Sequence, residues 1–161
     1  MNPKESHLKA MKRILRYLKG TDNLCLFYPS GCPFNLVGFT DADYAQCTID
    51  RKSTSGMAQF LGPCLVSWAS KKQHTVALST AEAEYVAAAS CCSQLLWLRQ
   101  QLSDFGLRYA SVPILCDNNS AINIAKNPVQ HSRTKHIEVR HHFLRDYICR
   151  KRTCLYEFCW Y

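Results

Sequence analysis

The chain has 161 residues, enough for one domain with a sizeable buried core. Hydrophobic residues make up 47% of it and charged residues 20%, ordinary values for a folded globular protein that argue against disorder. No apolar run approaches the ~18 residues needed to cross a bilayer, and the polar, charged start is not typical of a secretory signal. We therefore expect an intracellular protein with no membrane segment.

The ten cysteines show neither a disulfide nor a zinc pattern, because no two have Cys-x-x-Cys spacing. We interpret them as free thiols, several of them buried in apolar stretches. The alternative is a metal site built from histidines and cysteines near the C-terminus, although their spacing fits no standard zinc pattern. Its candidate ligands are His131, His136, His141, His142, Cys149 and Cys154.

The net charge of +8 is concentrated at the two ends of the chain. Residues 1–20 hold six Lys and Arg against one Glu, and residues 131–152 hold seven against two acids. The middle, residues 21–130, is nearly neutral, with seven basic and eight acidic residues. Two basic ends suit a polyanionic partner, because neutralising phosphates releases counterions. The alternative is that these residues form solvated helix faces.

The first predicted element is an amphipathic helix of about four turns that stops at Gly20. Its apolar residues recur at helical spacing between lysines and arginines: Leu8, Met11, Ile14, Leu15 and Leu18. Short strand-like segments follow at residues 24–28, 36–40, 56–61 and 65–70. Because short turns join successive strands, we predict an antiparallel meander of three.

The chain then changes to helical periodicity. Ser79 and Glu82 match a capping box, which predicts a helix from there to about Phe105. The remaining predictions are a strand at residues 112–116, a helix capped within residues 117–120 and ending near Lys126, a helix at 135–150 and a strand at 154–158. Strands and helices in one compact chain predict an α/β fold with helices packed on a sheet.

Three acidic residues occupy positions that suit metal-dependent chemistry. Asp41 and Asp117 each follow an apolar strand, and open α/β sheets hold functional groups beyond the carboxyl ends of their strands. Glu84 lies one turn into a predicted helix and is freer than Glu82, which has a capping role. Converging carboxylates repel one another unless a divalent cation such as Mg²⁺ or Mn²⁺ neutralises them. Two such ions can activate a water and stabilise the leaving oxygen of a phosphodiester.

Each of these acids also has a structural interpretation. Asp117 suits a helix cap, and Glu84 suits the positive end of a helix dipole. Asp41 and Asp43 are both typical turn residues. Spacing alone therefore leaves a metal-dependent nuclease as one hypothesis among several.

Six segments, in the same order along the chain, resemble the ribonuclease H region of copia-type (pseudovirus) retrotransposon Pol polyproteins. They are GFTDADYA (residues 38–45), DRKSTSG (50–56), SWASKKQ (67–73), ALSTAEAEY (77–85), CDNNSA (116–121) and HSRTKHI (131–137). A further segment, MKRILRYLKGT (11–21), resembles the end of the connecting segment of reverse transcriptase. The resemblance covers nearly the whole chain.

The resemblance implies a ribonuclease H-like mixed sheet, in which antiparallel strands 1–3 are followed by parallel strands and helices pack on the sheet. Residues 1–21 are then the tail of the connecting segment, and residues 22–161 the ribonuclease H-like domain. The implied partners are an RNA–DNA hybrid and the reverse transcriptase domain of the same polyprotein, with no membrane. The implied location is cytoplasmic, in a virus-like particle.

The implied reaction is hydrolysis of the RNA strand of an RNA–DNA hybrid with two Mg²⁺ or Mn²⁺ ions. Matching positions make Asp41, Glu84 and Asp117 the catalytic, metal-binding acids, with Asp43 and Glu82 as alternative alignments. A further family motif is matched by Arg133, Lys135 and His136, for which we expect phosphate contact. For His136, a hydrogen bond at a helix start is the alternative.

The chain departs from the family pattern at its C-terminal end. Family members continue past the last strand into a helix that supplies a fourth metal-binding acid, and neither Asp146 nor Glu157 matches that motif. We therefore expect the last helix and the fourth acid to be missing and the activity to be impaired. The alternatives are a catalytically dead nucleic-acid-binding remnant and a module that interacts with reverse transcriptase through the N-terminal helix.

Overall fold

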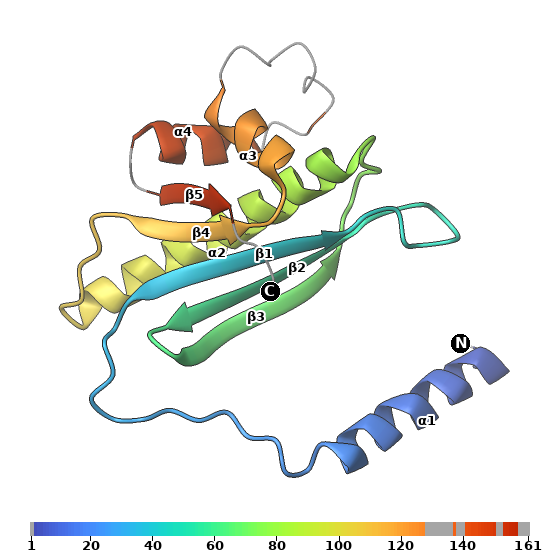
Figure 1. Cartoon of the computed structure of the whole chain (residues 1–161). Helices are drawn as coiled ribbons and strands as arrows, with labels where there is room; N and C mark the ends of the chain where they lie inside the picture. Colours follow the sequence, from blue (N-terminus) through green and yellow to red (C-terminus); the bar gives the residue numbers. More distant parts are fainter. Residues whose placement is uncertain (1, 128–136, 138–140, 151–152, 158–161) are drawn as a thin grey trace.

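In the computed structural model, the described residues are 2–127, 137, 141–150 and 153–157. Figure 1 shows them as a sheet with helices packed on it and one helix set apart. In chain order the elements are α1 (Glu5–Gly20), β1 (Leu36–Asp43), β2 (Thr54–Leu61), β3 (Cys64–Lys72), α2 (Thr80–Asp104), β4 (Val112–Cys116), α3 (Asn119–Lys126), α4 (Phe143–Cys149) and β5 (Thr153–Glu157).

The five strands form one mixed sheet in the order β3-β2-β1-β4-β5. β1, β2 and β3 pair antiparallel, whereas β4 runs parallel to β1, and β5 parallel to β4. The chain reaches β4 from β3 through α2, the kind of long connection that a parallel strand needs. The predicted mixed sheet, antiparallel first and parallel afterwards, is confirmed.

The meander strands are longer than predicted. β1 continues to Asp43 and β3 to Lys72, because both pair with β2 as far as Thr54. The turn between β2 and β3 depends on Gly62, which has a φ of +59°. A Cβ at that position would also collide with the carbonyl oxygen of Pro33.

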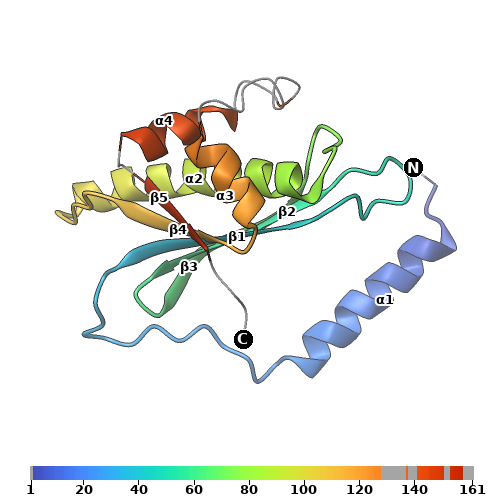
Figure 2. The same ribbon diagram turned by 45° about the horizontal axis from the view of Figure 1, so that its top comes forward.

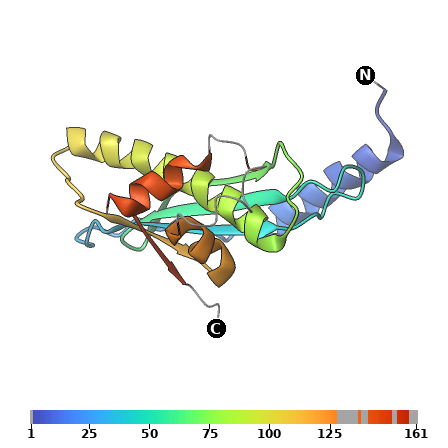
Figure 3. The same ribbon diagram turned by 90° about the horizontal axis from the view of Figure 1, so that it is seen from above.

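One face of the sheet is covered by helices. Figures 2 and 3 show α2, α3 and α4 on the same side of the strands. Buried residues of the two central strands alternate with less buried ones: Leu36, Gly38, Thr40, Val112, Ile114 and Cys116. The opposite face carries Phe39 and Phe60, whose rings meet edge to face with centroids 5.4 Å apart. Among the described residues, no helix packs on that second face.

α2 begins with the predicted cap. The Ser79 hydroxyl accepts a hydrogen bond from the Glu82 N–H (3.2 Å), and the Glu82 carboxylate accepts one from the Leu78 N–H (2.7 Å). The helix then lies close against β1, because Gly38 has no side chain. A Cβ on Gly38 would lie 2.6 Å from Leu95 Cδ1 and 2.8 Å from Cys91 Sγ.

Two predicted elements are wrong or shortened. Residues 24–28 form no strand and are not part of the sheet. That segment is held instead by the Tyr28 hydroxyl, which donates to the Leu65 carbonyl (2.6 Å). Of the helix predicted at 135–150, the structure describes α4 from Phe143 to Cys149. Just before it, the Tyr85 hydroxyl of α2 donates to the His141 carbonyl (3.3 Å). Within that prediction, Ile137, His141 and His142 are not in an α-helix, whereas residues 135, 136 and 138–140 lie outside the described residues, as does Phe158 of the predicted last strand.

α1 is the predicted amphipathic helix, and none of its residues is buried. Figure 1 shows it separated from the sheet by an extended segment. Its apolar stripe, which includes Met11 and Leu15, is therefore open to solvent. In the described part of the chain, no helix combines the length and the apolar character that crossing a membrane requires.

We expect Gly38→Ala to lower the free energy of unfolding by about 1–3 kcal/mol, because the new methyl group overpacks the contact between β1 and α2. Urea unfolding of the variant and the wild-type chain measures this loss. The matched control is Gly20→Ala in α1, where a Cβ meets no atom within 4 Å. Equal losses in the two variants would contradict the close approach of helix and strand.

Candidate functional site

β1 and β4 bring two of the predicted acids to one place. The parallel pairing of these strands ends at Thr40 opposite Cys116, so Asp41 and Asp117 are the next residues on neighbouring strands. Both are exposed. The prediction that Asp41 lies at the end of a strand is wrong, because β1 continues along β2 to Asp43. It is the pairing with β4 that stops, and this leaves both aspartates at an open edge.

α2 brings the third acid from the helix-covered face. Glu84 is only 6% exposed, and its Oε1 accepts a hydrogen bond from the Ala42 N–H (3.0 Å). The same N–H donates to Asp41 Oδ1 (2.8 Å), so one backbone donor holds two carboxylates. Carboxylate oxygens of Glu84 and Asp117 lie within 4.8 Å of each other and of Cys116 Sγ. The three predicted acids therefore converge.

The electrostatics of this cluster favour a cation. Burial, together with the nearby carboxylates of Asp117 and Asp41, raises the pKa of Glu84 from 4.5 to about 8, against the lowering effect of the Ala42 hydrogen bond. Glu84 Oε2 is buried and has no hydrogen-bond partner among the described residues. An unpartnered buried oxygen beside two further carboxylates fits the hard oxygen ligands that Mg²⁺ and Mn²⁺ bind.

The two alternative acids lie in different environments. Glu82 is buried and its carboxylate accepts the Leu78 N–H, which confirms its capping role. Asp43 is exposed at the end of β1, opposite Thr54, and is not among the groups that shift the pKa of Glu84. The geometry thus groups Asp41 with Glu84; their assignment as metal ligands stays a prediction.

Sequence reasoning missed one member of the cluster. Cys116 was assigned to the buried free thiols, and it is indeed free and fully buried. Burial raises the pKa of its thiol to about 12. The alternation of β4 places it on the same face as Ile114, beneath α2. Its position directly before Asp117 was the available signal, because the end of a strand delivers two successive residues to the same edge.

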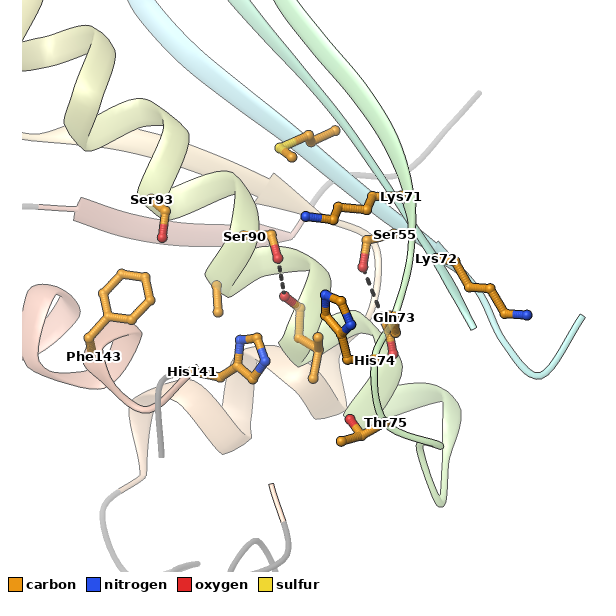
Figure 4. Close-up of a pocket in the computed structure, with 13 residues that line it drawn as sticks. Ser55, Lys71, Lys72, Gln73, His74, Thr75, Ser90, Ser93, His141 and Phe143 are labelled. Atoms are coloured by element: carbon orange, nitrogen blue, oxygen red, sulfur yellow. Dashed lines mark hydrogen bonds between the residues drawn. The ribbon is translucent and has the colours of Figure 1, made fainter. Parts of the chain in front are cut away.

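A cavity of about 370 Å³ lies between the ends of β2 and β3 and one side of α2. Figure 4 shows Lys71, His74 and His141 around this space. Gln73 also lines this cavity, and its side-chain amide donates to Ser55 Oγ (3.0 Å) and to the Ala83 carbonyl (2.9 Å). Cationic and hydroxyl groups therefore surround a hollow beside the start of α2.

Of the remaining predicted site residues, the structure describes some and leaves others out. Arg133, Lys135 and His136 lie outside the described residues. His142 of the alternative zinc site has a structural neighbour, since its Nδ1 lies 3.2 Å from the Tyr85 hydroxyl. Cys149 is exposed and free. The zinc alternative stays a prediction, because others of its candidate ligands also lie outside the described residues.

We expect the metal-free chain to lose stability as the pH rises from about 4.5 to about 8. Within this range the folded chain keeps a proton on Glu84 that the unfolded chain releases, so folding is favoured below it and less favoured above it. The loss amounts to at most about 5 kcal/mol, at about 1.4 kcal/mol per pKa unit. Urea unfolding in EDTA at about pH 5 and pH 8.5 measures it.

Glu84→Gln is the control for this prediction. The amide mimics the protonated acid, so the variant should lack this part of the pH dependence. Wild-type and variant profiles that run parallel across the range would show that Glu84 does not titrate as its environment implies.

No protein-family model matches the sequence. The chain is 44% identical over 147 residues to the retrovirus-related Pol polyprotein from transposon TNT 1-94 of Nicotiana tabacum, an alignment that covers 91% of this chain and 11% of the polyprotein. The chain thus spans about a tenth of the length of that relative.

Two solved structures show the same fold. Metagenomic LC11-RNase H1 from compost has a TM-score of 0.53 at 11% identity, over 78% of this chain and 84% of its own. The foamy viral protease-reverse transcriptase in complex with RNA/DNA hybrid has a TM-score of 0.54 at 14% identity, over 98% of this chain and 19% of its own. Along nearly its whole length the chain is therefore similar to a segment of retrovirus-related Pol polyproteins from transposons, and its fold is that of ribonuclease H domains.

Proposed function

We propose that this domain hydrolyses the RNA strand of RNA–DNA hybrids. The observation that carries the proposal is the convergence of Asp41, Glu84 and Asp117 around a buried, unpartnered carboxylate oxygen. Such a cluster in a ribonuclease H-like fold is the arrangement that a divalent cation would hold together.

Asp41, Glu84 and Asp117 would hold Mg²⁺ or Mn²⁺, which when bound activates water and stabilises the leaving oxygen of a phosphodiester. Asp41 and Asp117 are exposed and face the solvent edge, where a nucleic-acid strand can approach them. Glu84 supplies a fixed oxygen, because α2 and the Ala42 N–H hold it in place. The site therefore combines one rigid acid with two accessible ones.

Two observations support a nucleic-acid substrate. The foamy viral protein of similar fold is described in complex with RNA/DNA hybrid. In this chain, Lys71 and His74 line a cavity beside the start of α2 and offer hydrogen-bond donors to a phosphate backbone. Discrimination of RNA from DNA would depend on contacts to the 2′-hydroxyl group.

A second candidate function is favoured by α1. All of its residues lie open to solvent, with an apolar stripe on one side and Lys9, Lys12, Arg13 and Arg16 gathered around one hollow. Such a helix suits packing on a larger partner, for which we propose the reverse transcriptase domain of the same polyprotein. In this second candidate function, the chain binds the reverse transcriptase domain and does not cleave nucleic acid.

We expect Asp41→Asn to reduce hydrolysis by more than about 100-fold, because it removes the charge of one metal-binding acid. The assay follows a labelled RNA–DNA hybrid incubated with the chain and Mg²⁺ or Mn²⁺. The matched control is Asp43→Asn, an identical change two residues further along β1, which should leave the rate within about threefold of the wild type.

The outcomes separate the hypotheses. Cleavage lost in Asp43→Asn but kept in Asp41→Asn would mean that the alternative alignment is right. A wild-type chain that binds hybrid but does not cleave it would overturn hydrolysis and favour the binding remnant. The same assay decides whether the activity of this chain is impaired, as expected from the sequence.

We expect the double variant Arg13→Glu/Arg16→Glu to weaken hybrid binding about tenfold. We also expect the slope of log Kd against log salt concentration to fall by about two, since each phosphate contact contributes about one to that slope. Fluorescence anisotropy across a salt series measures both values. Arg99→Glu with Arg108→Glu is the matched control, because it makes the same charge change at the far end of α2. Identical salt slopes in both pairs would contradict a role for α1 in binding.

A further inference from the structure

The acid cluster contains a sulfur atom. Cys116 Sγ, an oxygen of Glu84 and an oxygen of Asp117 all lie within 4.8 Å of one another. Among the described residues, these are the three His, Cys, Asp or Glu side chains whose ligand atoms lie close enough together to share one ion. The thiol comes from the sheet, the glutamate from α2, and the aspartate from the turn before α3, so the fold itself brings them together.

A separate observation points to a ligand at this place. Glu84 is 6% exposed, and its Oε2 is buried without a hydrogen-bond partner among the described residues. Buried polar atoms are rarely left unsatisfied, because the lost hydration costs free energy. The unpartnered oxygen belongs to the same carboxyl group that approaches the thiol and Asp117.

The chemistry of these three donors differs from that of a purely acidic site. Carboxylate oxygens suit Mg²⁺, whereas a thiol favours softer cations such as Zn²⁺ and Cd²⁺. Zinc binds sulfur at about 2.3 Å and carboxylate oxygen at about 2.0–2.2 Å, commonly with three protein ligands and a water. Asp117 is exposed and outside the strand, so its side chain can move toward the ion without disturbing the core.

We propose that Glu84, Cys116 and Asp117 bind a single thiophilic divalent cation, Zn²⁺ or Cd²⁺, through one thiolate and two carboxylates. Binding replaces the S–H bond of Cys116 by a sulfur–metal bond and, where Glu84 is protonated, its O–H bond by an oxygen–metal bond. The displaced protons go to solvent, with no oxidation or reduction. The cation occupies the acids proposed for Mg²⁺ and so inhibits hydrolysis. Only this inhibition rests on the proposed function; the binding itself does not.

The test is a Cd²⁺ titration of the full chain, followed by the ultraviolet absorbance of the cadmium–thiolate bond and by calorimetry. The matched variants are Cys116→Ser and Cys91→Ser, since both thiols are fully buried. Cys91 contacts Gln59 and the Phe39 carbonyl instead of an acid. We expect Cys116→Ser to lose one tightly bound equivalent and its absorbance, and Cys91→Ser to keep both.

A further variant keeps the test decisive if Cys116→Ser does not fold. Asp117→Asn changes an exposed side chain, and we expect it to weaken Cd²⁺ binding at this site about 10–100-fold while circular dichroism stays unchanged. Tight binding and absorbance that match the wild type in both Cys116→Ser and Asp117→Asn would overturn the proposal.

Inhibition is measured separately. We expect micromolar Zn²⁺ to inhibit Mg²⁺-supported hydrolysis in the wild type at least tenfold more strongly than in Cys116→Ser. If the wild type does not hydrolyse hybrid at all, the proposed function fails, while the Cd²⁺ titration still decides the binding site. If Zn²⁺ inhibits a folded Cys116→Ser variant as strongly as the wild type, the inhibition does not depend on Cys116 and this part of the proposal is wrong.

Discussion

The carboxyl group of Glu84 is buried between α2 and the open edge of β1 and β4, and this burial constrains the whole site. One of its oxygens accepts the Ala42 N–H, and the other has no hydrogen-bond partner among the described residues. A buried, uncompensated carboxylate costs several kcal/mol, so the group must hold either a proton or a cation. Burial accordingly raises the pKa of Glu84 to about 8. The neighbouring Asp41 and Asp117 add negative charge and make a cation the stronger compensation.

The fold delivers these groups by two independent routes. The parallel pairing of β1 and β4 ends at Thr40 and Cys116, so Asp41 and Asp117 follow side by side. Their proximity therefore does not depend on a contact between their side chains. α2 reaches that edge only because it lies close to β1, where Gly38 leaves room for Cys91 and Leu95. The helix is anchored at its start by Ser79 and packed along its length, which fixes the height of Glu84 over the strands.

The parts of this structure that were predicted correctly are those determined locally. The cap at Ser79, the periodicity of α2 and the apolar run of β4 are short-range signals, and they placed Glu84 and Asp117 on the right elements. The errors involve partners distant in the chain. Tyr28 of the segment 24–28 bonds Leu65 of β3, and the residues just before α4 bond Tyr85 of α2. The proximity of Cys116 to Glu84 likewise needs the packing of helix on sheet, which no local pattern encodes.

The same burial links protons and metals at one carboxyl group. A proton on Glu84 and a cation bound to Glu84 exclude each other, so cation affinity must increase as the pH rises toward about 8. A cation that binds only the folded chain also stabilises it by mass action, and most strongly where the free carboxylate is most costly. Mg²⁺ needs only the oxygens of the acids, whereas a thiophilic cation also removes the proton of Cys116, whose pKa burial raises to about 12. Under the proposed binding, a softer cation would therefore have the steeper pH dependence, because its binding would release the thiol proton in addition to that of Glu84.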